Sequence, residues 1–332
     1  MTRVIVDAMG GDNAPKAIVD GCIKATEEFD VLITLVGKEE LIKEALGEYS
    51  SDKISIVNAN EVITNNDDPA LAIRRKKESS VVVALNMLAN GDGDAFVSAG
   101  STGAVVSGAT LIVKRIQGVR RVAIGTIFPT PGKPTLVLDC GANADCTPEF
   151  LEQFAVMGNA YMKAVYSLDN PTVGLLNNGA EEHKGSTLYK ESHQILKGMD
   201  LNFVGNVEAR DVLSSVADVV VADGFAGNVL LKSTEGTASF FGKKLKAMFT
   251  KNLLTKICAL LLSSSIKEMK SSFDYTEHGG APILGAKKVV IKAHGSSNAK
   301  AFYNAIKQAK NFYENGVIEA IESNLKKSLD EQ

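Results

Sequence analysis

The chain of 332 residues has no tryptophan and only four cysteines and four histidines. No two cysteines form a CxxC pair and the histidines are scattered, so the sequence gives no sign of a structural metal site. Sparse free cysteines fit a reducing cytoplasm. No apolar run approaches the ~20 residues that a membrane-spanning helix needs. We also expect no secretion signal, because the N-terminus leads directly into a strand.

The sequence also lacks a large excess of charge of one sign, because the formal net charge is only −3. A balance so close to neutral gives no reason to expect a nucleic-acid partner. Common nucleotide and hydrolase motifs are missing as well. The absence of GxxxxGK(S/T), GxGxxG, GxSxG and HExxH argues against a P-loop enzyme, a dinucleotide-binding protein, a serine hydrolase and a zinc protease. We therefore expect no cofactor and no metal.

What the sequence does contain is an alternation of short β-branched runs with helical stretches. The runs are "RVIVD", "VLITLVG", "ISIVNA", "DAFVSAG", "VAIGTIFPT", "PTLVLDCGAN", "TVGLLNNG", "LNFVGNV", "ADVVVADG" and "KKVVIKAHG". Helices are expected over 68–90, 102–116, 148–165 and 298–314. Such alternation predicts a three-layer α/β fold, in which a largely parallel sheet carries helices on both faces. We expect residues 1–332 to form a single catalytic domain, in one or two lobes.

Glycine and small polar residues gather in turns that follow these runs. The turns are at residues 7–15, 98–104, 139–148, 222–228 and 292–300. Ligands of α/β sheets bind beyond the carboxyl ends of the strands, where we expect these turns to meet. Glycine lets backbone N–H groups approach a ligand, and a helix N-terminus favours an anion. The turns therefore predict a phosphate or carboxylate site, although glycine at tight turns also has a purely structural use.

Several segments, taken in order, resemble the bacterial phosphate acyltransferases of phospholipid synthesis. They are "VIVDAMGGDNAP", "VSAGSTGA", "LDCGAN", "GNVEARD", "VVVADGFAGNVLLK", "GGAPILG" and "KAHGSSNAKA". The resemblance runs from residue 3 to about residue 312, nearly the whole chain. Two small residues depart from the family pattern, since Ser101 stands where the family usually has Asn and Ala226 where it has Thr.

The resemblance implies a reaction, a fold and an assembly. Enzymes of this family convert acyl-acyl-carrier protein and inorganic phosphate to acyl phosphate and free carrier protein. Their fold resembles that of isopropylmalate dehydrogenases and phosphate acetyltransferases, and they are dimers. The next user of acyl phosphate is a membrane glycerol-phosphate acyltransferase. Two alternatives stay open, a coenzyme-A-dependent phosphate acyltransferase and a non-catalytic membrane scaffold for lipid-synthesis enzymes.

Attack of phosphate on a thioester needs positive charge and N–H donors, which stabilise the dianion and the tetrahedral oxyanion. Lys184, in "EEHKGS", is the first candidate, as a phosphate ligand or carbonyl-polarising group, with a surface lysine as the alternative. Asn228, in "DGFAGN", would donate to the oxyanion or cap the following helix. His294, in "KAHGSSN", would protonate the leaving thiolate or brace its loop.

Further residues are expected to bind phosphate or substrate. They are Gly10, Gly11, Ser98, Ser101, Thr102, Asp223, Gly227, Ser296 and Ser297. Asp223 would orient Lys184 or a loop amide, unless it only forms a turn. In "DAMGGD", Asp7 and Asp12 would repel phosphate, so we expect them to bond to loop amides, with Asp12 capping the following helix.

Two other features have a functional and a structural interpretation. Cys140 and Cys146 would support an acyl-cysteine intermediate, but buried structural thiols are the preferred interpretation. The basic run at 72–80 would dock an acidic carrier protein, offer Arg74 or Lys76 to the phosphate, or form a solvated face.

The segment 235–272 is expected to form long helices with leucines and an isoleucine on one face and lysines beside them. Its apolar stretch, 253–262, is too short to cross a bilayer of ~30 Å. It fits a helix pair at a dimer interface or a helix tip on an anionic lipid surface. We expect a cytoplasmic homodimer with a weak peripheral contact to the inner face of the membrane.

Overall fold

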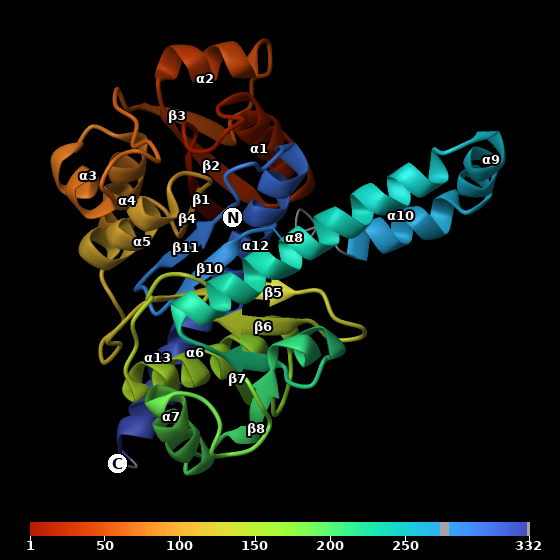
Figure 1. The fold of residues 1–332 in the computed structure, drawn as a ribbon. Helices are drawn as coiled ribbons and strands as arrows, with labels where there is room; N and C mark the ends of the chain where they lie inside the picture. Colours follow the sequence, from red (N-terminus) through yellow and green to blue (C-terminus); the bar gives the residue numbers. More distant parts are fainter. Residues whose placement is uncertain (273–278, 331–332) are drawn as a thin grey trace.

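The computed structural model describes residues 1–272 and 279–330, which form one eleven-stranded sheet with helices around it. The strand order is β3-β2-β1-β4-β11-β10-β5-β6-β9-β7-β8. Helices lie on both sides of the sheet, which gives three layers (Figure 1). The expected α/β fold with a largely parallel sheet is therefore confirmed.

The sheet consists of two parallel halves that run in opposite directions. One half contains β1 (Thr2–Asp7), β2 (Val31–Gly37), β3 (Ile54–Asn58), β4 (Ala95–Ser98) and β11 (Val289–Lys292). The other contains β6 (Thr135–Leu138), β7 (Thr172–Asn177), β8 (Asn202–Glu208) and β9 (Val219–Val221). Between them lie β5 (Ala123–Phe128) and β10 (Ala281–Leu284), which pair antiparallel with each other and with their outer neighbours.

The strand register makes the carboxyl ends of the two halves meet in the middle of the sheet. Ile291 of β11 pairs with Pro282 of β10, and Leu138 of β6 pairs with Gly125 of β5. The pairing of β10 with β5 places Pro282 and Gly125 in the same row. The ends of β11 and β6 are therefore separated by only two strands, and the turns that follow them converge at the centre of the molecule.

The helices cover the sheet in two groups. One face carries α1 (Lys16–Glu28), α2 (Glu39–Leu46), α6 (Pro148–Tyr166), α7 (Thr187–Lys197), α12 (Ala299–Glu314) and α13 (Val317–Asp330). The other carries α3 (Pro69–Arg75), α4 (Ser80–Asn90), α5 (Thr102–Gly108), the π-helical turn η1 (Ala109–Val113) and the 3₁₀ turn η2 (Ala209–Ser214). Strands between two such layers are buried on both sides, which is why their sequences are almost continuously apolar.

Two expected helices and one strand differ from the sequence prediction. The stretch 68–90 forms α3 and α4, because the chain turns between them and the Ser79 hydroxyl donates to the Lys76 carbonyl oxygen at 2.7 Å. The stretch 102–116 passes from α5 into η1 and stops at Lys114, which has a φ of 70°. Strand β10 is absent from the prediction, because "APIL" is short and contains a proline.

Helices α8 (Gly224–Phe249), α9 (Leu253–Leu261) and α10 (Ser263–Ser272) form an arm that projects from the body (Figure 1). The expected protruding helical segment at 235–272 is thus confirmed. Helix α9 lies at the tip, where Leu253 and Leu260 are each 75% exposed and Leu261 is 78% exposed. Within the described ranges, no helix combines the length and apolarity that a membrane span requires.

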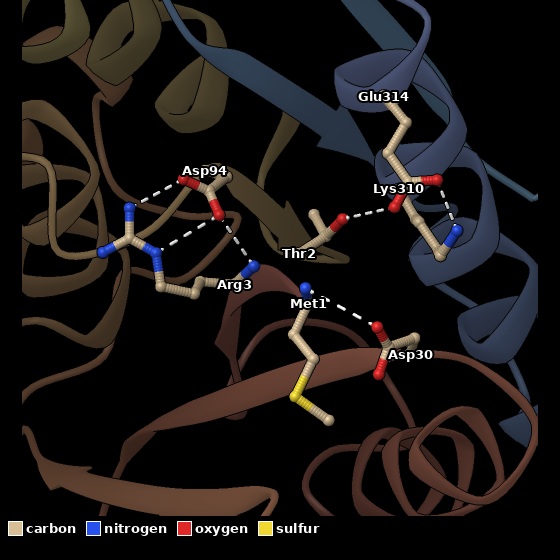
Figure 2. A network of polar contacts seen from close by, with 7 residues as sticks. All are labelled: Met1, Thr2, Arg3, Asp30, Asp94, Lys310 and Glu314. Atoms are coloured by element: carbon tan, nitrogen blue, oxygen red, sulfur yellow. Dashed lines mark hydrogen bonds and ion pairs between the residues drawn. The ribbon is translucent and has the colours of Figure 1, made fainter.

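The N-terminal end of β1 is fixed by polar contacts on both sides (Figure 2). Arg3 donates to Asp94 through two side-chain N–H groups, at 2.7 and 3.2 Å, and through its backbone N–H at 2.8 Å. On the other side, the Thr2 hydroxyl donates to Glu314 of α12 at 2.8 Å. These contacts anchor the strand whose opposite end carries the turn "DAMGGD".

Candidate active site

Two cavities open where the turns of the two sheet halves converge. The larger cavity has a volume of about 470 Å³ and the smaller one a volume of about 380 Å³. They share Thr102, the first residue of α5, and Lys292, the last residue of β11. A group bound in one cavity therefore lies next to whatever occupies the other.

The smaller cavity is polar and is bordered by turns from three strands. Gly11 follows β1, Gly100 follows β4 and Gly295 follows β11, and the loop before α3 adds Thr64. Gly11 has a φ of +97°, and a Cβ at this position would lie 2.9 Å from the Gly295 carbonyl oxygen. The turns thus approach one another more closely than side chains would allow. Backbone packed around a small polar space in this way suits an anion.

The larger cavity is mostly apolar and lies over β5 and the start of β10, between α5 and α8. Its walls include Ile124 and Phe128 of β5 and Leu231 of α8. The α8 side extends from Asn228 to Ala238, which is about 15 Å at the rise of an α-helix. This wall is mixed, because Lys232, Thr234 and Glu235 line it beside Leu231 and Ala238. The cavity as a whole is elongated and mostly apolar, which fits an extended hydrocarbon chain.

The loop after β6 is organised by a buried carboxylate. Asp139 is fully buried and accepts backbone N–H groups from Ile124 at 2.9 Å, Gly141 at 3.1 Å and Asn143 at 2.7 Å. The Asn143 side-chain amide also donates to it at 2.9 Å. One side chain therefore fixes the conformation of the whole turn "DCGAN".

Helix α8 begins in direct backbone contact with this loop. A Cβ at Gly227 would lie 2.0 Å from the Asp139 carbonyl oxygen, and one at Gly224 would lie 2.6 Å from that of Asn143. This packing places Asn228 beside Gly141, at the wall of the larger cavity. The two glycines of the helix start are therefore required for the close approach.

Asp223, and not Asn228, caps α8. One Asp223 oxygen accepts the Ala226 N–H at 2.8 Å, and the other accepts the Tyr189 hydroxyl at 2.7 Å. The alternative in which Asn228 caps this helix is wrong, because Asn228 lies within it. Both Asp223 oxygens thus serve the fold by joining α8 to α7.

A row of polar side chains ends β1, β4 and β11 on the face that carries the cavities. The strand register aligns three apolar residues in one row across these strands, namely Ile5, Phe96 and Val290. Two residues further along each strand, on the same face, a polar row follows, which consists of Asp7, Ser98 and Lys292. All three polar residues are buried. The Ser98 hydroxyl donates to Asp7 at 2.6 Å, and the Gly100 N–H donates to Ser98 at 2.9 Å. Lys292 is absent from the sequence prediction, although it begins the "KAHG" motif.

Burial changes the pKa values at both ends of this row. Burial raises the pKa of Asp7, against the opposing effects of its hydrogen bonds and of Lys292. Burial also lowers the pKa of Lys292 to about 8, and attraction by Asp7 limits this decrease. The ammonium donates to the Ala293 carbonyl oxygen. At pH 7 Lys292 therefore still carries a positive charge between the two cavities.

Lys184 lies outside both cavities, in the loop between β7 and α7. Its side chain is 42% exposed, and its ammonium is 4.0 Å from the Glu181 carboxylate. The Asn177 side-chain amide donates to the Lys184 carbonyl oxygen at 3.3 Å. The structure therefore does not bring Lys184 together with the cavity residues.

His294 lines the larger cavity, whereas Ser296 and Ser297 line neither cavity. The Ser296 N–H donates to His294 Nδ1 at 3.3 Å, so a neutral ring carries its proton on Nε2. Partial burial and the charge of Lys232 lower the pKa of His294, so the ring is neutral at pH 7. Ser297 is buried, and within the described part of the chain its hydroxyl has no hydrogen-bond partner.

Of the remaining expected residues, Ser101 lines the smaller cavity together with Gly11 and Thr102. Gly10 lies beneath this cavity, since a Cβ there would be 2.4 Å from an Asp7 oxygen. Gly10 is therefore needed for packing against the polar row.

Asp12 does not cap the following helix, so that expectation is wrong. Helix α1 begins at Lys16 after Pro15, and no side chain caps it. A capping side chain accepts the N–H group of a residue two or three positions further along the chain. The free N–H groups of α1 begin at Lys16, four residues after Asp12, so the Asp12 side chain does not reach them. The Asp12 backbone N–H instead donates to the Gly295 carbonyl oxygen at 2.8 Å, which joins two turns of the site.

The cysteines behave as structural thiols. Cys140 is buried against the larger cavity, and burial raises its pKa to about 12. Cys146 is half-buried, and desolvation likewise raises its pKa to about 12. A thiol that stays protonated at neutral pH is a poor nucleophile. Among the described residues, no group of His, Cys, Asp and Glu is arranged to hold a metal ion.

The basic run at 72–80 is only partly helical, because α3 ends at Arg75. Arg74 and Arg75 are exposed. The Lys76 ammonium donates to the Asp67 carboxylate at 2.8 Å and to the Val62 carbonyl oxygen at 3.1 Å. The hydrogen bond from Lys76 lowers the pKa of Asp67 to about 2. Lys76 is thus engaged by its own loop and does not line either cavity.

Solved structures share this fold. A phosphotransacetylase from Streptococcus pyogenes superposes with a TM-score of 0.64 over 96% of this chain and 94% of its own. The sequence identity is 18%, so the likeness establishes the fold alone. The protein therefore has the architecture of the phosphotransacetylases.

Related sequences share most of the chain. Residues 2–320 match the family described as fatty acid synthesis protein. A phosphate acyltransferase from Clostridium novyi (strain NT) is 51% identical over 98% of this chain and 99% of its own length. Another from Thermoanaerobacterium thermosaccharolyticum is 49% identical over 96% of each. The chain belongs to the fatty acid synthesis protein family, and its resemblance to phosphate acyltransferases is confirmed.

The contact between α8 and the Asp139 loop predicts a difference between two glycines of one helix. Gly227→Ala should lower the free energy of unfolding by about 2 kcal/mol or more, because its Cβ would overlap the Asp139 carbonyl oxygen. Gly236→Ala is the control, since a Cβ there has nothing within 4 Å, and it should stabilise the helix by up to about 1 kcal/mol. Urea denaturation measures both, and equal effects would contradict the close packing.

Proposed function

We propose that this protein transfers a fatty acyl group from acyl-acyl-carrier protein to inorganic phosphate, which yields acyl phosphate for glycerophospholipid synthesis. A phosphate oxygen attacks the thioester carbonyl directly, the carbon–oxygen bond forms, the carbon–sulfur bond breaks, and the carrier thiolate leaves. The protonated thiol of Cys140 is consistent with a reaction that has no acyl-enzyme intermediate. The name of the relatives, phosphate acyltransferase, supports the proposal.

The observation that carries this proposal is the junction of a polar and an apolar cavity at Thr102 and Lys292. Phosphate would occupy the polar cavity, beside Gly11 and Ser101. The acyl chain would lie in the apolar cavity, along Leu231 of α8 and the apolar side chains of β5. The thioester carbonyl would then be at the junction, within reach of the phosphate oxygen.

Asn228 and His294 enter the proposal as hydrogen-bond donors at the wall of the larger cavity. The Asn228 amide would donate to the oxyanion of the tetrahedral intermediate. Because the His294 ring is neutral with its proton on Nε2, we assign it a donated hydrogen bond to the thioester instead of protonation of the thiolate. A thiolate is already a fair leaving group near its pKa of ~8.5. The proposed steps use no cofactor and no metal.

The other expected residues would hold the site in shape. They are Gly10, Ser98, Asp223, Gly227, Ser296 and Ser297, whose contacts are made largely with neighbouring loops or with the polar row. We propose that their contribution to phosphate and substrate binding is indirect, through the backbone they position.

The direct test is the formation of acyl phosphate by the purified protein from palmitoyl-acyl-carrier protein and phosphate, with palmitoyl-coenzyme A in parallel. We expect a product that depends on phosphate and on the carrier-protein thioester. A product from the coenzyme A thioester alone would favour a coenzyme-A-dependent enzyme. No product from either donor would favour a non-catalytic scaffold.

Lys184 is retained as a proposed catalytic residue that would have to reach the substrate from outside the cavities. Lys184→Ala should then lower the rate at least ~100-fold, as expected for a lost electrostatic donor. Lys197→Ala is a matched control, because Lys197 is a nearby exposed lysine that pairs with Glu182 at 2.7 Å. Near-normal turnover by folded Lys184→Ala protein would remove this residue from the mechanism.

We further propose a cytoplasmic homodimer whose arm tip makes a weak contact with the inner face of the membrane. The exposed leucines of α9 would enter the lipid surface, and Lys251, Lys256 and Lys267 would lie near anionic headgroups. Acyl phosphate would then be released close to the membrane glycerol-phosphate acyltransferase that uses it.

Replacing Leu260 and Leu261 with Glu should abolish binding to phosphatidylglycerol vesicles, because two carboxylates would face the hydrocarbon. The unmodified protein should bind weakly and be released at high salt. Leu41→Glu on α2, where Leu41 is 39% exposed, is the control on the body of the protein. A double variant that still floats with vesicles would contradict the lipid contact, and one that becomes a monomer would assign the leucines to the dimer interface.

A further inference from the structure

We propose that Lys292 is the residue that holds the attacking phosphate at the junction of the two cavities, and that Asp7 positions Lys292 through the buried row that also contains Ser98. This inference rests on the proposed function, because it assigns the cation of the phosphate subsite. Lys292 would be a catalytic residue in contact with substrate, whereas Asp7 would be a positioning residue.

The location of Lys292 distinguishes it from other lysines near the site. Lys292 is 8% exposed and lines both cavities. The Lys232 side chain is 54% exposed and is paired with Glu235 at 2.8 Å. An ammonium has three N–H donors, and the Ala293 carbonyl oxygen takes one from Lys292. The other two donors would be available to a phosphate oxygen and to the thioester carbonyl at the junction, since Lys292 lines both cavities.

Asp7 supplies the opposite charge without facing the phosphate. Its oxygens accept the Ser98 hydroxyl at 2.6 Å and the Met9 N–H at 3.1 Å. Gly10 and Gly100 pack directly over it, since a Cβ on either would lie 2.4 Å or 3.3 Å from an Asp7 oxygen. The glycines thus let backbone cover the carboxylate. An anion in the polar cavity would meet this backbone and the ammonium, and not the Asp7 carboxylate; of the acidic residues, Asp12 lines this cavity.

The groups that face Lys292 set the pH range in which it binds phosphate. Asp7 and Asp12 favour its charged form, whereas burial and Lys232 oppose it. The neighbouring His294 is neutral at pH 7. Lys292 therefore keeps its charge below about pH 8 and loses it as the pH rises through that value. Without the Asp7 charge, the pKa of Lys292 would fall, and the charge would be lost at a lower pH.

The test uses the full-length protein, isothermal titration with inorganic phosphate, and steady-state kinetics of acyl phosphate formation. Lys292→Met should weaken phosphate binding and raise the KM for phosphate at least ~30-fold, as expected for a lost charge-assisted contact. The KM for the acyl donor should change little. Lys287→Met is the control, because Lys287 is exposed beyond the opposite end of the same strand.

Asp7→Asn tests the positioning role through the pH profile. Phosphate binding by this variant should be weak at pH 8 and recover toward the unmodified value at pH 6.5, because a lower pKa leaves Lys292 neutral at the higher pH. A variant that is equally weak at both pH values would show a structural role only and would overturn the assignment of Asp7.

Unchanged phosphate affinity in folded Lys292→Met protein would overturn the assignment of Lys292. So would a failure of the unmodified protein to bind phosphate. If Lys292→Met does not fold, the double variant Asp7→Asn/Lys292→Met removes both buried charges and takes its place. Phosphate binding that depends on Lys292, without acyl phosphate from any thioester, would instead support the phosphate site and contradict the proposed function.

Discussion

The site depends on one constraint in the backbone, the reversal of strand direction at β10 and β5. In a fully parallel sheet the carboxyl ends of all strands lie at one edge. Here three successive antiparallel pairings turn the second half of the sheet around, and the register brings Ile291 and Leu138 into the same row. Turns from opposed halves therefore meet face to face. One half contributes the polar cavity, and both halves together enclose the apolar one.

Helix α8 connects this centre to the rest of the molecule. It begins at the backbone contact between Gly227 and Asp139, lines the larger cavity as far as Ala238, and continues into the arm. Beyond the cavity, Phe240 and Phe241 are 55% and 59% exposed, so apolar surface continues along the helix. On the proposed function, an amphiphilic product that leaves the cavity would meet this surface on its way to the tip.

Much of the fold is predictable from the sequence, because parallel strands buried on both faces give strong apolar runs that alternate with helices. Strand β10 is not, since four residues with a proline have too weak a pattern, and its pairing is set by distant partners. The glycine-rich turns predict where the candidate site lies, and three of their residues, Gly11, Ser101 and Thr102, line the polar cavity. Lys292 begins the predicted turn at 292–300 but is missed as a site residue, because nothing in the motif shows that this lysine ends a buried strand. Its signal is the register, in which three adjacent strands end in Asp7, Ser98 and Lys292.

The polar row of Asp7, Ser98 and Lys292 occupies positions of the sheet where apolar side chains would otherwise be expected. Extending the row of Ile5, Phe96 and Val290 by another apolar row would stabilise the fold more than a buried Asp7 and Lys292 do, because desolvation of two charges is costly. The same low-dielectric surroundings strengthen the attraction between a buried ammonium and an anion beside it. A half-exposed lysine such as Lys184 is screened by solvent and acts only where it touches its ligand. Positive charge that must act on a fixed point between two cavities is therefore better placed at the end of a buried strand than on a surface loop.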